Sequence, residues 1–344
     1  MTDVVLKNQR IIGNYKKPYI IAEVNSSHNG HIDTAKQMVL SAKQVGCDCV
    51  KFQSWTADSL YSKTYYDANP IAKRIVQKFS FSNDQLSEIV NYCHDIGISF
   101  SSTPYSQSEV DFLVNRCDVP FIKVASMEIN NMPFLEYIAK KGLPVILSTG
   151  MADLNEIKQA VSIFEKVGNP KLVLLHCISI YPAPAATIQL NNILLLREEF
   201  PSYPIGFSDH TDGTEIAAAA TALGACVIEK HLTLDKSKPG MDNNMAIEPP
   251  EMENLVKNCT NVFEAMGTKE RVVSAAEYEQ RKKMRRSVVY LADKLAGSVL
   301  TEHDLGVKRP GTGLPPIKIQ DLIGKTLCHD VSSDTMVLEA DVLI

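Results

Sequence analysis

Residues 204–232 read PIGFSDHTDGTEIAAAATALGACVIEKHL and contain one complete strand–helix–strand unit. The short apolar runs at 204–209 and 226–232 predict buried strands, and the alanine-rich segment 214–223 between them predicts a helix. Two strands joined through a helix run parallel in one sheet, and near-continuous apolar runs are typical of strands buried on both faces. The stretch therefore predicts a βαβ unit.

The same alternation recurs from about residue 19 to residue 266. Strands are predicted at 19–24, 49–53, 99–104, 121–126, 144–149, 172–177, 204–209 and 226–232. Amphipathic helices are predicted at 33–45, 83–96, 132–141, 154–167, 214–223 and 251–266. Eight βα units predict a TIM (β/α)8 barrel. The alternative, a doubly wound open sheet, normally has fewer strands and a glycine-rich turn after the first one, which EVNSS at 23–27 does not form.

The texture of the sequence changes after the last predicted barrel helix. The charged segment EYEQRKKMRR (277–286) predicts a linker, and residues 287–344 show short alternating runs punctuated by Gly and Pro. Such runs predict a small, mainly β module. The predicted parts are a catalytic barrel at 1–276, a linker at 277–286 and a small domain at 287–344.

Composition excludes several classes of protein. Over 344 residues, 45% are hydrophobic and 22% charged, which is typical of a soluble globular protein. The net charge of −5 argues against a general nucleic-acid binder. Eight cysteines without a repeated CxxC pair predict buried, reduced thiols and favour a cytoplasmic location. We expect no leader or membrane anchor, because the first residues are polar and no run of about 18 apolar residues occurs.

The predicted strands end in polar residues, and a TIM barrel draws its reactive groups from these ends. Lys51 and Lys123 end two of the strands. One buried lysine is usually a structural ion pair, but two lysines surrounded by hydroxyl groups predict a pocket for a phosphate and a carboxylate. The hydroxyl groups belong to Thr103, Ser126, Ser148 and Ser208.

Two histidines end adjacent predicted strands, His210 and His231, about one βα unit apart. Imidazoles in these positions could share a metal ion and leave coordination positions open for water and substrate, as a Lewis-acid site requires. A lone histidine is more often a hydrogen-bonded core residue, but the pair favours the metal site. His176 and His28 are weaker candidates.

Three carboxylates are candidates for acid/base work near the same rim, Glu23, Glu128 and Asp242. For each of them a structural salt bridge is an equally good interpretation. Glu229 could likewise be a core partner of Lys51 or Lys230.

Seven motifs follow one another along the barrel: IIAEVNSSHNG (20–30), VKFQ (50–53), FIKVASMEINN (121–131), LPVILSTGM (143–151), LLHCISIYPAP (174–184), IGFSDHTDG (205–213) and VIEKHLTLDKSKPGMD (227–242). In this order they resemble the motifs of the sialic acid synthase family, the phosphoenolpyruvate-dependent synthases of nonulosonic acids. The segment RRSVVYLADKLAGSVLTEHDLGVKRPGTG (285–313) resembles the antifreeze-like (SAF) domain that ends these proteins. The resemblance runs nearly from end to end.

The resemblance implies a transferase reaction. C3 of phosphoenolpyruvate attacks the aldehyde of an open-chain N-acyl hexosamine, water adds at C2, and phosphate leaves with cleavage of the C–O bond. A divalent ion, Mn²⁺ or Mg²⁺, activates the aldehyde oxygen.

The implied roles fall on matching positions of this chain. His210 and His231 match the metal ligands, and Glu23 matches the acid/base residue. The phosphoenolpyruvate pocket corresponds to Lys51, Thr103, Lys123, Ser126, Ser148 and Ser208, with Ser179 in place of an Asn. Sugar contacts correspond to Gln53, Glu128, Tyr181 and Asp242. The resemblance further implies that Arg309 reaches the sugar in the partner subunit's barrel, within a homodimer that exchanges its small domains.

The departures from the family pattern cluster on the sugar side. They are Asn25-Ser26-Ser27 in place of Gly-Ile-Asn, Ser179, and Asp242-Asn243 in place of Asp-His. The acceptor therefore stays open between N-acetylmannosamine and a 2,4-diacetamido sugar. Two further hypotheses are a synthase acting on a phosphorylated aldose, which would need more cations, and a non-catalytic sugar- or ice-binding protein.

Overall fold

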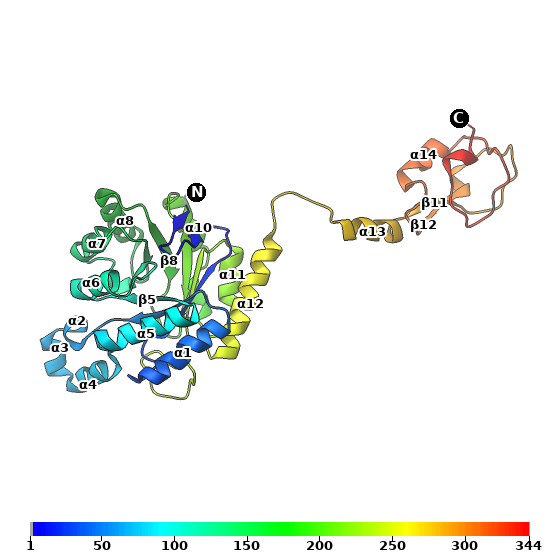
Figure 1. Cartoon of the computed structure of the whole chain (residues 1–344). Helices are drawn as coiled ribbons and strands as arrows, with labels where there is room; N and C mark the ends of the chain where they lie inside the picture. The colour runs from blue at the N-terminus through cyan, green and yellow to red at the C-terminus, as the bar shows by residue number, and fades with distance from the viewer. Residues whose placement is uncertain (1–2, 344) are drawn as a thin grey trace. The chain divides into compact units, whose positions relative to one another are not determined.

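The computed structural model describes residues 3–343 and divides into two compact units, Met1–Gly267 and Thr268–Ile344. This boundary lies ahead of the one predicted at residue 276. Figure 1 shows the first unit as a sheet surrounded by helices and the second as a small unit of short elements.

The first unit is a barrel of parallel strands, which confirms the predicted fold. Its strands are β3 (Tyr19–Glu23), β4 (Cys49–Gln53), β5 (Ser99–Thr103), β6 (Ile122–Val124), β7 (Val145–Ser148), β8 (Leu172–Cys177), β9 (Ile205–Asp209) and β10 (Val227–His231). They pair in the order β5-β4-β3-β10-β9-β8-β7-β6. Across the remaining join the hydroxyl of Ser101 donates to the carbonyl of Phe121 at 3.0 Å. The sheet is therefore a nearly closed barrel.

Helices follow the strands and cover the outside of the barrel. They are α1 (Ile32–Gln44), α2 (Ala57–Leu60), α3 (Lys63–Ala68), α4 (Pro70–Phe79), α5 (Asn83–Ile96), α6 (Gln107–Asn115), the 3-10 turn η1 (Ser126–Glu128), α7 (Met132–Ala139), α8 (Leu154–Val167), α9 (Ala185–Ile188), α10 (Asn192–Glu199), α11 (Glu215–Ala222) and α12 (Pro249–Met266). Helices α5 and α8 match their predicted ranges. Capping boxes at Ser82 and Asp153 begin them, and left-handed Gly97 and Gly168 end them.

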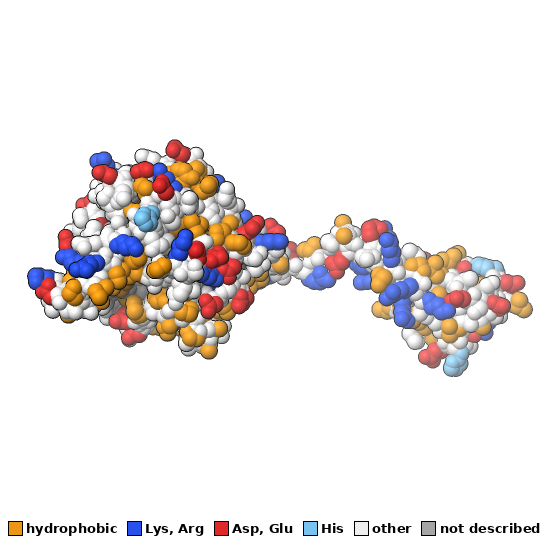
Figure 2. All heavy atoms as spheres, turned by 90° about the horizontal axis from the view of Figure 1, so that it is seen from below, with side chains coloured by type: hydrophobic (Ala, Val, Ile, Leu, Met, Phe, Trp, Pro, Cys, Tyr) orange, Lys and Arg blue, Asp and Glu red, His pale blue; other side chains and the backbone are white. Residues whose placement is uncertain are grey.

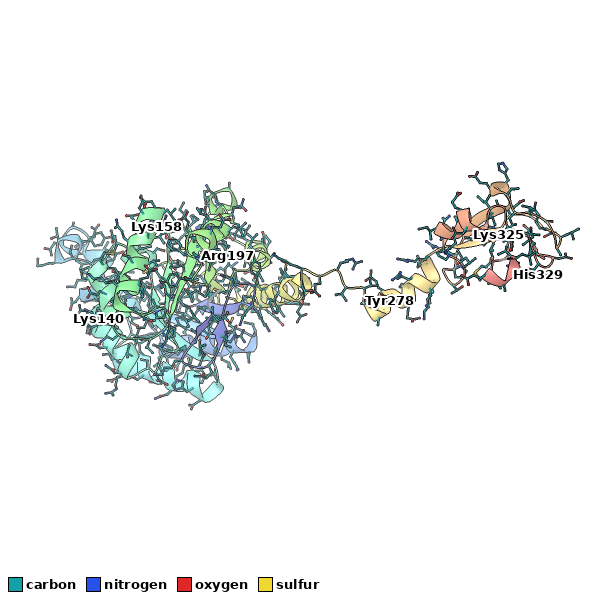
Figure 3. All side chains as sticks on the ribbon, turned by 90° about the horizontal axis from the view of Figure 1, so that it is seen from above. Lys140, Lys158, Arg197, Tyr278, Lys325 and His329 are labelled. Carbon is teal, nitrogen blue, oxygen red and sulfur yellow. The ribbon has the colours of Figure 1, made fainter. Side chains whose placement is uncertain are left out.

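The base of the barrel is closed by a hairpin that the sequence did not predict. Strands β1 (Val4–Val5) and β2 (Ile11–Ile12) pair antiparallel, and Leu6 and Ile12 pack with the interior residues of the strands. Arg197 on α10, labelled in Figure 3, has its guanidinium carbon 4.6 Å from the ring centroid of Tyr15. The buried apolar base leaves the opposite end of the barrel for polar chemistry.

The second unit contains α13 (Ala275–Met284), β11 (Ser287–Tyr290), β12 (Leu305–Lys308), α14 (Ile319–Leu322) and the 3-10 turns η2 (Glu302–Asp304), η3 (Pro316–Lys318) and η4 (Glu339–Asp341). Strands β11 and β12 pair antiparallel over a core that includes Val288, Leu300 and Val337. The segment 277–286, predicted as a linker, is largely helical. The hydroxyl of Ser274 caps α13, and no residue of this helix is buried. Because the helix has no buried apolar face, its charged sequence lacks the amphipathic pattern that predicts a helix.

The surface agrees with the composition of the chain. Figure 2 shows acidic and basic side chains interspersed over the visible face of the barrel unit. All eight cysteines are free thiols, and seven of them are buried, as predicted; Cys328 is the exception and is exposed. Across residues 3–343, helices of sufficient length and apolarity to cross a membrane do not occur.

Candidate active site

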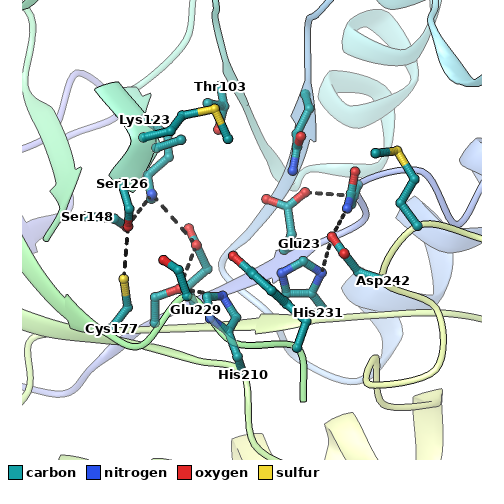
Figure 4. A pocket seen from close by; sticks show the side chains of 18 of the residues that line it. Glu23, Thr103, Lys123, Ser126, Ser148, Cys177, His210, Glu229, His231 and Asp242 are labelled. Carbon is teal, nitrogen blue, oxygen red and sulfur yellow. Dashed lines mark hydrogen bonds and ion pairs between the residues drawn. The ribbon is translucent and has the colours of Figure 1, made fainter. Parts of the chain in front are cut away.

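A cavity of about 290 Å³, lined by charged and hydroxyl side chains among apolar ones, opens where the barrel strands end. Its lining includes the last residue of most strands, which is the position expected for the reactive groups of this fold. The predicted site residues in the lining are Glu23, Lys51, Gln53, Thr103, Lys123, Ser126, Ser148, Ser179, Tyr181, Ser208, His210, His231 and Asp242. In Figure 4, Lys123 and the serines occupy one side, Glu23 and Asp242 the other, and Glu229 and the histidines lie between them.

Lys123 lies among the hydroxyl groups of the cavity. Its Nζ donates to the hydroxyl of Ser148 at 2.6 Å and to the carbonyl of Val124 at 3.1 Å. The hydroxyl of Ser126 lies 3.1 Å from the Cys177 sulfur and accepts from the backbone N–H of Gly150 at 3.0 Å. An ammonium group and neighbouring hydroxyls at this spacing can hold the oxygens of a phosphate or carboxylate.

Lys51 lines the same cavity and has three polar neighbours. Its ammonium group forms an ion pair with Glu23 and donates to the hydroxyl of Thr103 at 3.2 Å. It also lies 3.8 Å from a carboxylate oxygen of Glu229. Burial lowers the pKa of Lys51 to about 7, against the opposing charge of Glu229. The charge of this lysine is therefore sensitive to pH in the neutral range.

Glu229 joins the two lysines. Its Oε1 is 3.8 Å from Lys123 Nζ and accepts from the hydroxyl of Ser208 at 3.0 Å. Although burial acts to raise the pKa of Glu229, the charges of Lys123 and Lys51 lower it, so the carboxylate is ionised at neutral pH. With Glu23 it balances both ammonium groups. An incoming anion must therefore compete with two internal carboxylates.

The two histidines face each other, with ring centroids 5.4 Å apart. Nδ1 of His210 lies 2.7 Å from the carbonyl of Ile178, which fixes the proton on that nitrogen and leaves Nε2 as an acceptor. Nδ1 of His231 lies 3.9 Å from Asp242. Burial lowers the pKa of both rings, and for His231 the neighbouring His210 lowers it further. Both imidazoles are thus neutral at pH 7.

Neutral imidazoles on adjacent strands have the chemistry of metal ligands. Among residues 3–343, no group of three His, Cys, Asp or Glu side chains converges in a geometry suited to a metal ion. The side chains that could ligate an ion at the strand ends are the two facing imidazoles of His210 and His231.

Gln53, Tyr181 and Asp242, three of the four residues predicted to contact the sugar, line the same cavity. The ring of Tyr181 lies 4.4 Å from that of His210. Gln53 accepts a hydrogen bond from the hydroxyl of Tyr105 at 2.9 Å. Burial raises the pKa of Asp242, while a hydrogen bond from Asn25 opposes that rise.

Several candidates lie outside the cavity lining. Glu128 is half-buried and accepts from Asn131 at 2.7 Å. Lys230 is paired with Asp209 at 2.9 Å, because alternate residues of a strand point to opposite faces. His176 contacts the carbonyl of Ile188 at 2.6 Å, and His28 stacks on Phe81. Arg309 belongs to the second unit, directly after β12.

Some lining residues were not predicted as contacts. They are Asn25, Trp55, Leu60, Tyr61, Tyr105, Ala125, Met127, Met151, Cys177, Glu229 and Met241. Trp55 and Tyr105 come two residues after the ends of β4 and β5, and this nearness to the strand ends was the available signal; Tyr61 follows the short helix α2. The sequence predicted Glu229 only as a salt-bridge partner and indicated Asn25 only as a departure from a family motif.

The fold defines a class of TIM-barrel proteins with a small, mainly β second unit. The SAF domain model matches residues 285–343, and the NeuB family model matches residues 38–271. The chain belongs to the NeuB family.

Similar proteins share most of their length with this chain. An N,N'-diacetyllegionaminic acid synthase of Legionella pneumophila is 38% identical over 333 residues, 93% of each chain. The N-acetylneuraminate-9-phosphate synthase of Homo sapiens is 35% identical and covers 96% of this chain and 94% of its own. The crystal structure of N-acetylneuraminic acid synthetase from Leptospira borgpetersenii, in complex with citrate, has a TM-score of 0.75 at 32% identity, covering 81% of this chain and 95% of its own. These relatives are named as synthases of nonulosonic acids or their phosphates, which supports the assignment of this chain as an enzyme.

Proposed function

We propose that this enzyme condenses phosphoenolpyruvate with an unphosphorylated N-acyl hexosamine and water to give a nonulosonic acid and phosphate. The observation that carries the proposal is that Lys51 and Lys123 flank one cavity with the paired histidines. The cavity thus combines donors for an anion with ligands for a Lewis acid. The acceptor is N-acetylmannosamine or a 2,4-diacetamido sugar.

In the proposed reaction, C3 of phosphoenolpyruvate forms a bond to the aldehyde carbon. Water adds at C2, and the bond between C2 and the phosphate oxygen breaks. Lys123, Ser148 and Ser126 hold the anion on one side of the cavity. Glu23 is the proposed acid/base residue of this reaction. Its Oε1 accepts a hydrogen bond from the backbone N–H of Asn25 at 2.7 Å, and its carboxylate forms an ion pair with Lys51.

A Mn²⁺ or Mg²⁺ ion held by His210 and His231 would polarise the aldehyde oxygen. The neutral rings support this proposal, because a protonated imidazole cannot ligate. Asp242 lies on the His231 side and holds the hydroxyl groups of the acceptor.

Arg309 is proposed to complete the sugar site in a homodimer. The SAF domain match covers this arginine, and its loop is rich in Gly and Pro. A site completed by the partner subunit would make dimerisation part of catalysis.

A phosphorylated acceptor is the second candidate, because some relatives are named as synthases of a 9-phosphate. Among the described lining residues, Lys51 and Lys123 are the only lysines or arginines, and both are engaged by internal carboxylates. A second phosphate would require further cations. The unphosphorylated sugar therefore fits the barrel better.

The test is phosphate release from phosphoenolpyruvate with a panel of amino-sugar aldehydes, each with and without a terminal phosphate. Release with an unphosphorylated N-acyl hexosamine is expected. No release with any sugar, in the presence of Mn²⁺ or Mg²⁺, would refute the synthase proposal. Faster release with the phosphorylated sugar would favour the second candidate.

A further inference from the structure

The turn after β3 brings one amide side chain into the cavity. Asn25 lines the cavity, is only 4% exposed, and has a φ of 42°. This left-handed conformation is adopted most readily by Gly, Asn and Asp. Most other residue types would be strained at this backbone position, and Asn25 places a polar side chain in the cavity from it.

The hydrogen bonds of Asn25 orient its amide group. The Nδ2 group donates to a carboxylate oxygen of Asp242, on the loop that follows β10. A carboxylate accepts hydrogen bonds, so the nitrogen side of the amide faces it. The carbonyl oxygen, Oδ1, takes no part in the contact with Asp242. It is buried and has no hydrogen-bond partner within residues 3–343.

A buried amide oxygen without a partner is unfavourable and uncommon, and it suggests a donor supplied by a ligand. The oxygen is a neutral acceptor with no hydrogen to donate. It repels the oxygens of a phosphate or carboxylate, so phosphoenolpyruvate is not its partner. A sugar, in contrast, carries O–H and N–H donors.

We propose that Asn25 is a specificity-determining residue whose Oδ1 accepts a hydrogen bond from an O–H or N–H group of the acceptor sugar. Its Nδ2 group at the same time holds Asp242 in place. The inference rests on the proposed synthase function and assigns a residue to its acceptor side. Sites that present such acceptors discriminate strongly against analogues without the matching donor.

The test compares Asn25→Gly with Asn29→Gly. Glycine suits both positions, because Asn29 also has a positive φ, of 54°, and it lies in the same turn outside the cavity lining. Loss of a neutral hydrogen bond should raise the acceptor KM about fivefold or more in Asn25→Gly. The KM for phosphoenolpyruvate and the melting temperature should stay near the wild-type values, and Asn29→Gly should match the wild type throughout.

A second comparison separates direct contact from an effect through Asp242. Asn25→Gly is introduced into Asp242→Ala, and acceptor affinity is measured from KM or, for a variant too slow to assay, by calorimetric titration with phosphoenolpyruvate present. A further loss of affinity in the double variant is expected if Oδ1 contacts the sugar. Equal affinity in the double variant and Asp242→Ala would overturn the direct contact.

The two proposals fail in different ways. A wild-type enzyme that releases no phosphate with any acceptor would refute the synthase function. An active wild type whose acceptor KM and choice among sugars are unchanged by Asn25→Gly would refute only the role of Asn25.

Discussion

Glu229 Oε2 lies 3.8 Å from Lys51 Nζ, although the two residues are far apart in the sequence. The same carboxylate lies 3.8 Å from Lys123 through its other oxygen. The two lysines are therefore joined through one buried counter-charge. An anionic substrate has to share both ammonium groups with Glu229.

Glu229→Gln should destabilise the barrel in the absence of substrate. The amide keeps the shape of the side chain but leaves buried ammonium charge without its counter-charge, which costs about 3 kcal/mol of unfolding free energy. Urea denaturation measures the change, with the surface variant Glu88→Gln as control, expected within about 0.5 kcal/mol of the wild type. Phosphoenolpyruvate should stabilise Glu229→Gln more than the wild type. Unchanged stability without substrate would contradict this account.

The affinity for phosphoenolpyruvate should fall as pH rises through neutrality. The pKa of Lys51 is about 7, so its ammonium group is protonated below that pH and loses its proton above it. Between pH 7 and pH 8.5 the loss of one linked charge should weaken binding about tenfold. Calorimetric titration across this range measures the effect. In Lys51→Met the affinity should be weaker throughout and its pH dependence flatter, and an equally steep profile in that variant would show that another group titrates.

His210→Ala and His231→Ala should each weaken Mn²⁺ binding by more than tenfold. Each variant removes one of the two proposed ligands, while the barrel strands keep their pairing. Electron paramagnetic resonance of free Mn²⁺ gives the affinity without relying on turnover. His94→Ala, on the exposed surface of α5, is the matched control and should bind like the wild type. Wild-type Mn²⁺ affinity in both site variants would refute the metal assignment.

Arg309→Ala should reduce turnover or acceptor affinity without changing the stability of the barrel unit. Lys308→Ala is the neighbouring control, because Lys308 forms an exposed pair with Asp334. The expected loss is about tenfold in kcat/KM, typical of a charged hydrogen bond to substrate.

Mixed dimers test whether the partner subunit supplies that arginine. Arg309→Ala subunits alone should keep about a tenth of the wild-type kcat/KM, and Lys51→Ala subunits alone should be nearly inactive. If the site is shared, the mixture regains activity, since one composite site then holds both native residues. Mass spectrometry first establishes that the subunits have exchanged. If activity then fails to recover, the shared site is rejected.

The sequence by itself determined the barrel and the ends of its strands. Apolar runs such as 226–232 recur with helix-forming segments between them, and both strand and helix periods depend on local spacing alone. For the same reason α5 and α8 were predicted with their full ranges. The strand-end rule then indicated where Lys51, Lys123 and the two histidines would meet.

The tertiary structure decided which of the remaining polar residues share the cavity. Glu229 and Lys230 are neighbours in sequence, yet one meets the cavity lysines and the other pairs with Asp209 away from the lining, because the strand alternates its faces. Glu128 was expected among the contacts but lies outside the lining, in η1. The hairpin at the barrel base is held by long-range packing that local patterns do not encode.

Asn25 shows most clearly what could not be predicted from the sequence alone. Its residue type and its place after β3 are legible in the sequence, but the hydrogen bond to Asp242 joins residues 217 positions apart. Only the closure of the barrel, with β10 pairing to β3, brings those loops together. Local spacing thus determined the barrel and the candidate groups, and long-range strand pairing decided which of them face one another.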